Sequence, residues 1–255
     1  MVELNKIYNE NCLTTMGQME AGALDLVVTS PPYDDLRTYN GYSFDFESVS
    51  SELVRCIKPG GVIVWVVGDS TKNGSESGTS FRQALHFMSL GLRLHDTMIF
   101  QKLNPVPMTH NRYEQGFEYM FVFSKGKPET FNPLMVPCLG FGEKRIRTFY
   151  NKTDTTTPTK IGSSGLIRET KRRANTWGYS VGTGNAKGHP AQFPYLLAKD
   201  HVMSWSNPRE VVYDPFSGAA TVALACKQNQ RVYIGSEISE AYWALGNERI
   251  QNLLI

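Results

Sequence analysis

Short apolar runs that alternate with segments of helical spacing are the feature that most restricts the fold of this chain. Leu24–Thr29 and Val62–Val67 are largely apolar runs of strand length, and Pro59–Gly61 separates the second run from the helical spacing of Phe46–Ile57. Such runs are typical of strands that are buried on both faces of a parallel sheet. The order strand, helix, strand therefore predicts an α/β fold with helices on both faces of a mostly parallel sheet.

The same alternation continues along most of the chain. We expect further strands at Lys6–Tyr8, Leu92–Lys102, Glu118–Ser124, Val211–Tyr213 and Arg231–Ile234, and further helices from about Leu13, at Phe81–Leu90, Phe193–Ser204 and Ala220–Asn229, and from Glu240. The strands at 92–102 and 118–124 are expected to form an antiparallel pair at the edge of the sheet. Lys72–Ser80, which is rich in Gly and Ser, is expected to be a surface loop.

Charge and periodicity both change in one internal stretch. Between Cys138 and Gly188 there are ten Lys or Arg and three Asp or Glu, a net charge of +7, which leaves −5 for the rest of a chain whose total is +2. Periodicity also disappears there, so we expect one main domain that carries an inserted lobe or long loop.

The composition also bears on environment and on metal binding. Because no apolar run reaches eighteen residues and the N-terminus lacks a secretory pattern, we expect a soluble, cytoplasmic protein that is not bound to a membrane. The four cysteines make no CxxC pair, which argues against a zinc site and against a disulfide framework and favours reduced thiols. They are Cys12, Cys56, Cys138 and Cys226.

The first chemical motif is Thr29–Tyr33, ThrSerProProTyr, at the end of a predicted strand. The exocyclic amine of a base is a poor nucleophile because its lone pair is delocalised into the ring. Ser30 Oγ and the carbonyl of Pro31 can accept its two N–H bonds, Pro32 stiffens the backbone, and Tyr33 offers a flat face to a base lifted out of its helix. A proline-rich turn with a packing tyrosine is the alternative that remains open.

The second motif is Asp214–Thr221, AspProPheSerGlyAlaAlaThr, between a short apolar strand and a helix. Such a turn lets backbone N–H groups approach a ligand closely, because Gly218 has no Cβ to obstruct it. Glu237 ends the next strand, where an acid can accept both hydroxyls of a ribose. A generic turn and a solvated Glu are the alternative.

These motifs together resemble the N4-cytosine and N6-adenine DNA amino-methyltransferases, in the circularly permuted group whose catalytic motif precedes the cofactor motif. LysProGlyGly (58–61), GluTyrMetPheValPheSerLys (118–125) and HisProAlaGlnPhePro (189–194) are similar to further family segments. The resemblance implies a Rossmann-like class I methyltransferase sheet with a small inserted target-recognition segment. It implies catalytic parts at 1–136, target recognition at 137–188 and cofactor binding at 189–255.

The resemblance also implies S-adenosylmethionine as the cofactor and DNA as the partner. The N-terminal segment 8–13 is expected to supply a strand near the cofactor's adenine, with Asn11 where relatives usually carry Asp. The catalytic residues implied are Ser30, Pro31, Pro32 and Tyr33. The cofactor-binding residues implied are Asn11, Cys12, His189, Phe193, Asp214, Pro215, Phe216, Ser217, Gly218, Thr221 and Glu237.

The basic stretch lies where this group carries its target-recognition segment, so we expect it to contact DNA through phosphate-binding cations and a stacking ring. A solubilising loop is the alternative for any single residue. The DNA-binding residues expected are Arg37, Tyr39, Lys144, Arg145, Arg147, Lys171, Arg172, Arg173 and Trp177.

We expect direct methyl transfer from the cofactor to the amine, without a covalent enzyme intermediate. Ser in the first position of the strip resembles the N4-cytosine enzymes, and an N6-adenine enzyme is the alternative. A protein-glutamine or RNA methyltransferase and a catalytically silent cofactor-binding or DNA-binding module are the rivals. The sequence leaves open whether the protein forms a homodimer and whether a cognate restriction endonuclease acts separately.

Overall fold

The computed structural model describes residues 2–32, 44–107, 111–150, 158–182 and 194–252. They form two compact units, one made of residues 1–132 and 175–255 and the other of residues 133–174. The larger unit contains the predicted α/β sheet, and the smaller one overlaps the predicted insertion 137–188 but begins at residue 133 and ends at residue 174.

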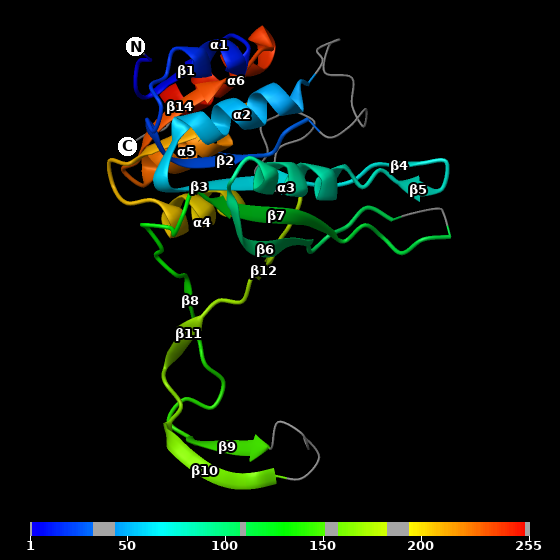
Figure 1. Cartoon of the computed structure of the whole chain (residues 1–255), viewed down its shortest axis with the longest axis vertical. Coiled ribbons are helices and arrows are strands. Elements are labelled where there is room, and N and C mark those ends of the chain that lie inside the picture. The colour runs from blue at the N-terminus through cyan, green and yellow to red at the C-terminus, as the bar shows by residue number, and fades with distance from the viewer. Residues whose placement is uncertain (1, 33–43, 108–110, 151–157, 183–193, 253–255) are drawn as a thin grey trace. The chain divides into compact units, whose positions relative to one another are not determined.

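One sheet of eight strands organises the larger unit, in the order β1-β14-β13-β2-β3-β7-β6-β12 (Figure 1). From β1 to β3 all neighbours are parallel, β7 is antiparallel to both β3 and β6, and β12 is parallel to β6. The strands are β1 (Lys6–Tyr8), β2 (Leu24–Thr29), β3 (Ile57–Val67), β6 (Arg93–Lys102), β7 (Phe117–Ser124), β12 (Thr176–Tyr179), β13 (Val211–Asp214) and β14 (Val232–Ser236). The sheet is therefore mixed, with a parallel half that carries the two motifs.

Helices cover both faces of this sheet, and the predicted α/β class is confirmed. The helices are α1 (Cys12–Gly17), α2 (Phe46–Cys56), α3 (Thr79–Ser89), α4 (Tyr195–Trp205), α5 (Thr221–Gln228) and α6 (Glu240–Gln251). On one face, Leu53 of α2 and Phe87 of α3 pack with Trp65 of β3 in a cluster of buried side chains. Because side chains alternate along a strand, Val64 points to the opposite face of the sheet. On that face α4 contacts β2 and α5, and α5 contacts β13 and β14.

Two parts of this unit differ from the sequence-based expectation. The pair β6–β7 is antiparallel as predicted, but β6 is not the edge strand, because β12 pairs with it from Ile99 to Lys102. The expected loop at Lys72–Ser80 contains a short hairpin of β4 (Thr71–Lys72) and β5 (Ser75–Glu76), after which α3 begins at Thr79.

The smaller unit consists of two separate antiparallel ladders. One pairs β8 (Met135–Pro137) with β11 (Thr170–Arg172), and the other pairs β9 (Lys144–Tyr150) with β10 (Pro158–Leu166). Residues 133–174 thus have their own backbone pairing, whereas Thr176–Tyr179, also within the predicted insertion 137–188, belongs to the large sheet.

Candidate active site

The two motifs predicted from the sequence follow neighbouring parallel strands. Tyr213 of β13 pairs with Val27 of β2, so Ser30 and Pro215, which come directly after these strands, lie at the same edge of the sheet. β14 is the other neighbour of β13 and ends at Ser236, which brings Glu237 to the same edge. In an α/β sheet this carboxyl edge is where ligands bind.

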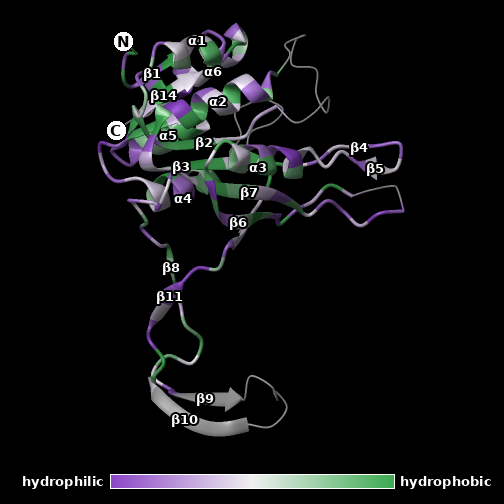
Figure 2. Cartoon of the chain, viewed as in Figure 1, coloured by the Kyte–Doolittle hydropathy of each residue, from purple (hydrophilic) through white to green (hydrophobic). Residues whose placement is uncertain are grey.

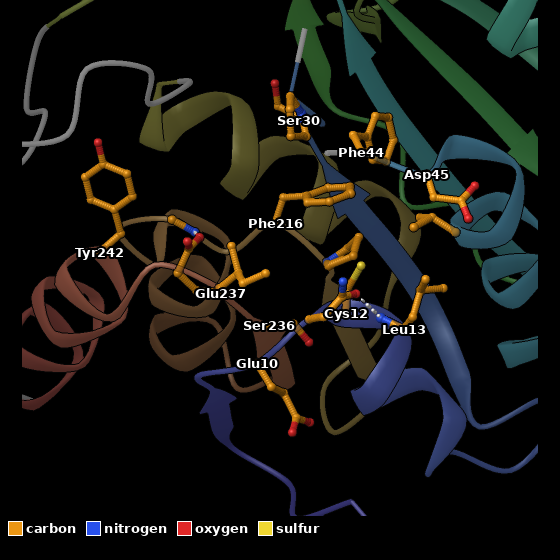
Figure 3. Close-up of a pocket in the computed structure, with 16 residues that line it drawn as sticks. Glu10, Cys12, Leu13, Ser30, Phe44, Asp45, Phe216, Ser236, Glu237 and Tyr242 are labelled. Atoms are coloured by element: carbon orange, nitrogen blue, oxygen red, sulfur yellow. Dashed lines mark hydrogen bonds between the residues drawn. The ribbon is translucent and has the colours of Figure 1, made fainter. Parts of the chain in front are cut away.

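A pocket opens at this edge, and five segments of the chain form its wall (Figure 3). They are the segment before and into α1, the strip Ser30–Pro32 after β2, α2 with the residues before it, the turn after β13, and α6 with the chain before it. The lining residues are Glu10, Asn11, Cys12, Leu13, Ser30, Pro32, Phe44, Asp45, Val49, Pro215, Phe216, Gly218, Ser236, Glu237, Ile238 and Tyr242. The strip and the turn, far apart in the sequence, therefore share one pocket.

A buried hydrogen bond joins the two strand ends directly behind the pocket. Thr29 Oγ1 donates to Asp214 Oδ1 at 2.7 Å, and the same oxygen accepts the backbone N–H of Phe216 at 3.1 Å. Thr29 is fully buried and Asp214 is 4% exposed. Burial raises the pKa of Asp214 to about 7, and the hydrogen bond from Thr29 opposes that rise. This bond holds the residue before Ser30 against the residue before Pro215.

The turn between β13 and α5 has a tight backbone that brings N–H groups to the pocket. Gly218 has a φ of 50° and Ala220 a φ of 64°, both in the left-handed region that favours glycine. The N–H of Ser217 donates to the carbonyl of Ser236 at 2.8 Å, which ties the turn to β14. Gly246 of α6 packs beneath, where an added Cβ would lie 3.1 Å from the Gly218 carbonyl oxygen.

Glu237 is held in place by the same turn. Its Oε2 accepts the N–H of Gly218 at 2.8 Å, and its Oε1 accepts the N–H of Ser239 at 2.8 Å. Burial raises the pKa of this carboxyl, and the backbone donors lower it. Each oxygen keeps further acceptor capacity, so the carboxylate is a fixed acceptor at the pocket wall.

The N-terminal segment forms another part of the wall. Asn11 caps α1, since its Oδ1 accepts the N–H of Leu13 at 2.9 Å, a role that Asp also performs. Cys12 is buried, and desolvation raises the pKa of its thiol to about 12, so it is a neutral side chain at pH 7. Behind it, hydrogen bonds of 2.8 Å connect the Ser236 hydroxyl to those of Thr15 and Tyr213.

Comparison with known proteins assigns the fold and the motifs to a family. A model of the N6_N4_Mtase family, described as DNA methylase, matches residues 24–248. The chain belongs to this DNA methylase family. It is an enzyme that transfers a methyl group from S-adenosylmethionine to DNA.

Individual relatives agree with this assignment. The methylase is 49% identical over 242 residues to the orphan methyltransferase M.BamHII of Bacillus amyloliquefaciens, covering 91% of this chain and 90% of that protein. It is 28% identical to the type II methyltransferase M.BglII of Bacillus subtilis, covering 94% and 67%. Among solved structures, the PvuII DNA methyltransferase (cytosine-N4-specific) has the same fold, with a TM-score of 0.74, 18% identity and coverage of 100% and 89%.

The structure places the predicted site residues of the methylase in three groups. Asn11, Cys12, Ser30, Pro32, Pro215, Phe216, Gly218 and Glu237 line the pocket. Four residues are buried and lie close to lining residues in the sequence, but they do not line the pocket themselves: Pro31, Asp214, Ser217 and Thr221. Tyr33, Arg37, Tyr39, His189 and Phe193 lie outside the described residues.

Sequence reasoning missed half of the pocket wall. Glu10, Leu13, Ser236 and Ile238 adjoin predicted residues, so their position in the chain was a usable signal. Phe44, Asp45, Val49 and Tyr242 reach the pocket from helix α2, the residues before it and helix α6. The Phe44 and Phe216 rings meet edge to face with centroids 5.2 Å apart, a contact that only the fold creates.

The expectation that Trp177 offers a stacking surface to DNA is corrected by the structure. Its side chain is 5% exposed, and its ring packs against that of His201 with centroids 4.6 Å apart. Because β12 is part of the large sheet, Trp177 is a core residue there.

Apart from Arg37, the expected DNA-binding cations lie in the smaller unit. Lys144, Lys171 and Arg172 are exposed, and Arg173 is half-buried. Arg145 and Arg147 belong to β9, and their side chains lie outside the described part of the structure.

The four cysteines lie in the described parts of the chain, and all are free thiols: Cys12, Cys56, Cys138 and Cys226. Within those parts no cluster of His, Cys, Asp and Glu has the arrangement of a metal site. None of the helices found there is long and apolar enough to span a bilayer.

Proposed function

We propose that this methylase acts on the exocyclic amine of a base flipped out of DNA, with Ser30–Tyr33 as its catalytic strip and N4 of cytosine as the atom that is methylated. The observation that carries the proposal is the shared pocket, in which Ser30 lies at the strand end next to the Gly218 turn and Glu237. A pocket that holds the amine at one wall and the methyl donor at the other brings the two reacting groups close enough for direct transfer.

The pocket residues suit S-adenosylmethionine by their chemistry. Glu237, fixed by two backbone donors, would accept the ribose hydroxyls, and Phe216 and Ile238 offer apolar surface to the adenine. Asn11 and the backbone around Cys12 would meet the polar edge of that ring. When bound, the cofactor supplies an electrophilic methyl group on a sulfonium.

The strip itself would activate the amine. Ser30 Oγ and the Pro31 carbonyl accept its two N–H bonds, which favours a tetrahedral nitrogen with an available lone pair. Tyr33, which lies outside the described residues, would stack on the flipped base. No cysteine attack is required. Cys12 holds its proton, and Cys138, part of the only ProCys pair, lies in the smaller unit and not at a strand end of the sheet.

The choice of cytosine N4 rests on Ser30 as the first residue of the strip. The structurally similar PvuII enzyme is named cytosine-N4-specific. Transfer from labelled cofactor to unmodified DNA, followed by digestion to nucleosides, tests the proposal. Label in N4-methylcytosine is the expected result. Label only in N6-methyladenine would reverse the choice of base, and label in RNA or peptide but not in duplex DNA would overturn the proposal.

The silent-module alternative has its own test. Replacing Tyr33 by Ala should abolish turnover and leave cofactor binding largely intact, whereas a module without catalysis shows no turnover to lose.

A homodimer, a cognate endonuclease and a cytoplasmic location stay predictions. The first is tested by sedimentation of the purified chain, the second by protection of modified DNA against candidate endonucleases, and the third by cell fractionation.

A further inference from the structure

The smaller unit concentrates the positive charge of the methylase. Residues 133–174 hold nine Lys or Arg and three Asp or Glu, a net charge of +6, so the other unit carries −4 of the total of +2. The boundary found from backbone packing therefore coincides with a reversal of charge. A polyanion is the partner that such a unit attracts.

The same unit also exposes large apolar side chains. Leu139 is 94% exposed, and Phe141 and Leu166 are each 64% exposed. These three residues, here called the apolar knuckle, lie on the connection between β8 and β9 and at the end of β10, and Figure 2 colours part of that connection as hydrophobic. Side chains with this exposure add little to the packing of the unit that carries them.

Backbone hydrogen bonds give the knuckle a defined shape. Cys138 N–H donates to the Glu169 carbonyl at 2.8 Å, and Gly142 N–H donates to the Ile167 carbonyl at 3.2 Å. Ile167 N–H returns a bond of 2.8 Å to the Glu143 carbonyl. Gly140 turns the chain at a φ of 73°, and a Cβ there would lie 2.8 Å from Glu143 Oε2. The fold thus presents these apolar side chains on a preformed turn.

Exposed cations stand beside the knuckle in sequence and in the ladder. Lys144 is the register partner of Leu166, Arg168 lies two residues after Leu166, and Lys171 and Arg172 belong to the next strand, β11. Apolar side chains with cations beside them are complementary to a nucleic-acid duplex, which carries phosphates on its outside and base edges and base steps in its grooves. In duplex DNA, a thymine methyl or a partly unstacked base step is the apolar element.

We propose that the apolar knuckle docks against duplex DNA, with its three side chains on base edges or a base step and the flanking cations on phosphates. This rests on the proposed function, because it names how the DNA substrate of the same enzyme is held. An apolar protein surface would match the three side chains but would gain nothing from a net charge of +6.

The test compares two double variants on a duplex that contains the site methylated by the wild-type chain. Leu139→Ala/Phe141→Ala should weaken binding about tenfold, as truncating buried interface residues does. Its slope of log affinity against log salt should equal that of the wild type. Lys171→Ala/Arg172→Ala should instead lower the slope by roughly 0.9 for each phosphate that is no longer neutralised. Leu4→Ala, which truncates a 54% exposed leucine of the other unit, is the matched control.

Phe141→Leu keeps an apolar group and should bind DNA within about twofold of the wild type, which separates the missing apolar surface from a folding defect. Unchanged DNA affinity of the knuckle double variant would overturn the inference. So would a change in its sedimentation with DNA affinity intact, since the knuckle would then serve a second copy of the chain. Failure of the wild type to label any DNA would instead count against the proposed function.

Discussion

Replacing Thr29 by Val is the perturbation that most sharply tests how the two strand ends are joined. Valine matches threonine in shape, so the change removes the 2.7 Å hydrogen bond to Asp214 without opening a cavity. Asp214 keeps the N–H of Phe216 and stays buried. The loss should therefore appear as a less stable fold and a misplaced Ser30.

The size of the loss should depend on pH, because burial raises the pKa of Asp214 to about 7. At pH 5.5 the native carboxyl is protonated, so losing a neutral hydrogen bond should lower the free energy of unfolding by about 1 kcal/mol. At pH 8.5 it is ionised beside the Glu237 carboxylate and the neutral Cys12, and losing a bond to a charged group should cost about 2–3 kcal/mol. Because the native pKa of Asp214 lies above its value in the unfolded chain, the free energy of unfolding falls as pH rises from about 4 to about 7. The hydrogen bond from Thr29 lowers the native pKa, so in Thr29→Val this fall continues to higher pH.

Urea unfolding at both pH values measures the effect, with Thr29→Ser as the control that keeps the hydroxyl. The methyl-transfer rate of Thr29→Val at pH 8 should fall more than its cofactor affinity, since the strip is displaced and Glu237 is not. Thr29→Ser also loses a buried methyl group, whose cost of about 1 kcal/mol should not depend on pH. Equal destabilisation of Thr29→Val at pH 5.5 and 8.5, or a serine variant whose destabilisation grows between these pH values as much as that of the valine variant, would refute the reasoning.

Three further changes test separate parts of the structure. Glu237→Gln replaces one carboxylate oxygen by an amide donor that cannot accept a backbone N–H, so calorimetry should show cofactor binding weakened about tenfold or more. Trp177→Ala should lower the free energy of unfolding by about 3–5 kcal/mol and leave the salt dependence of DNA binding unchanged; the reverse pattern would restore its role at DNA. Gly246→Ala should press on the Gly218 turn and lower both melting temperature and cofactor affinity, whereas Gly17→Ala, where nothing lies within 4 Å, should lower neither.

The order of strands and helices was predictable because each period in the sequence reports which faces of an element are buried. The runs at 24–29 and 62–67 form adjacent buried strands of the sheet. β12 was not predictable in the same way. Its four residues, Thr176–Tyr179, follow a basic polar stretch and become a strand only through pairing with β6. Trp177 was misassigned for the same reason, because it follows the basic run 171–173 in the sequence but packs against the rings of His201 and Tyr179 in the fold.

The candidate site divides along a similar line. Ser30, Gly218 and Glu237 could be predicted because chemistry at a strand end needs particular residue types after an apolar run. Phe44 and Tyr242 could not, since they reach the pocket only when α2 and α6 pack beside it. The Thr29–Asp214 bond was equally hidden, because a buried threonine in an apolar run looks like any strand residue until its partner is in place.

In the proposed mechanism Ser30 holds the amine while other residues hold the cofactor, and the Ser30→Ala variant tests that division most directly. Calorimetry of cofactor binding and a single-turnover assay of methyl transfer to DNA should be run on the same preparation. We predict cofactor affinity within about twofold of the wild type and a transfer rate lower by about 100-fold, the scale for removing one positioned hydrogen-bonding group. A wild-type transfer rate, or a loss of cofactor affinity that matches the loss of rate, would contradict this division of roles.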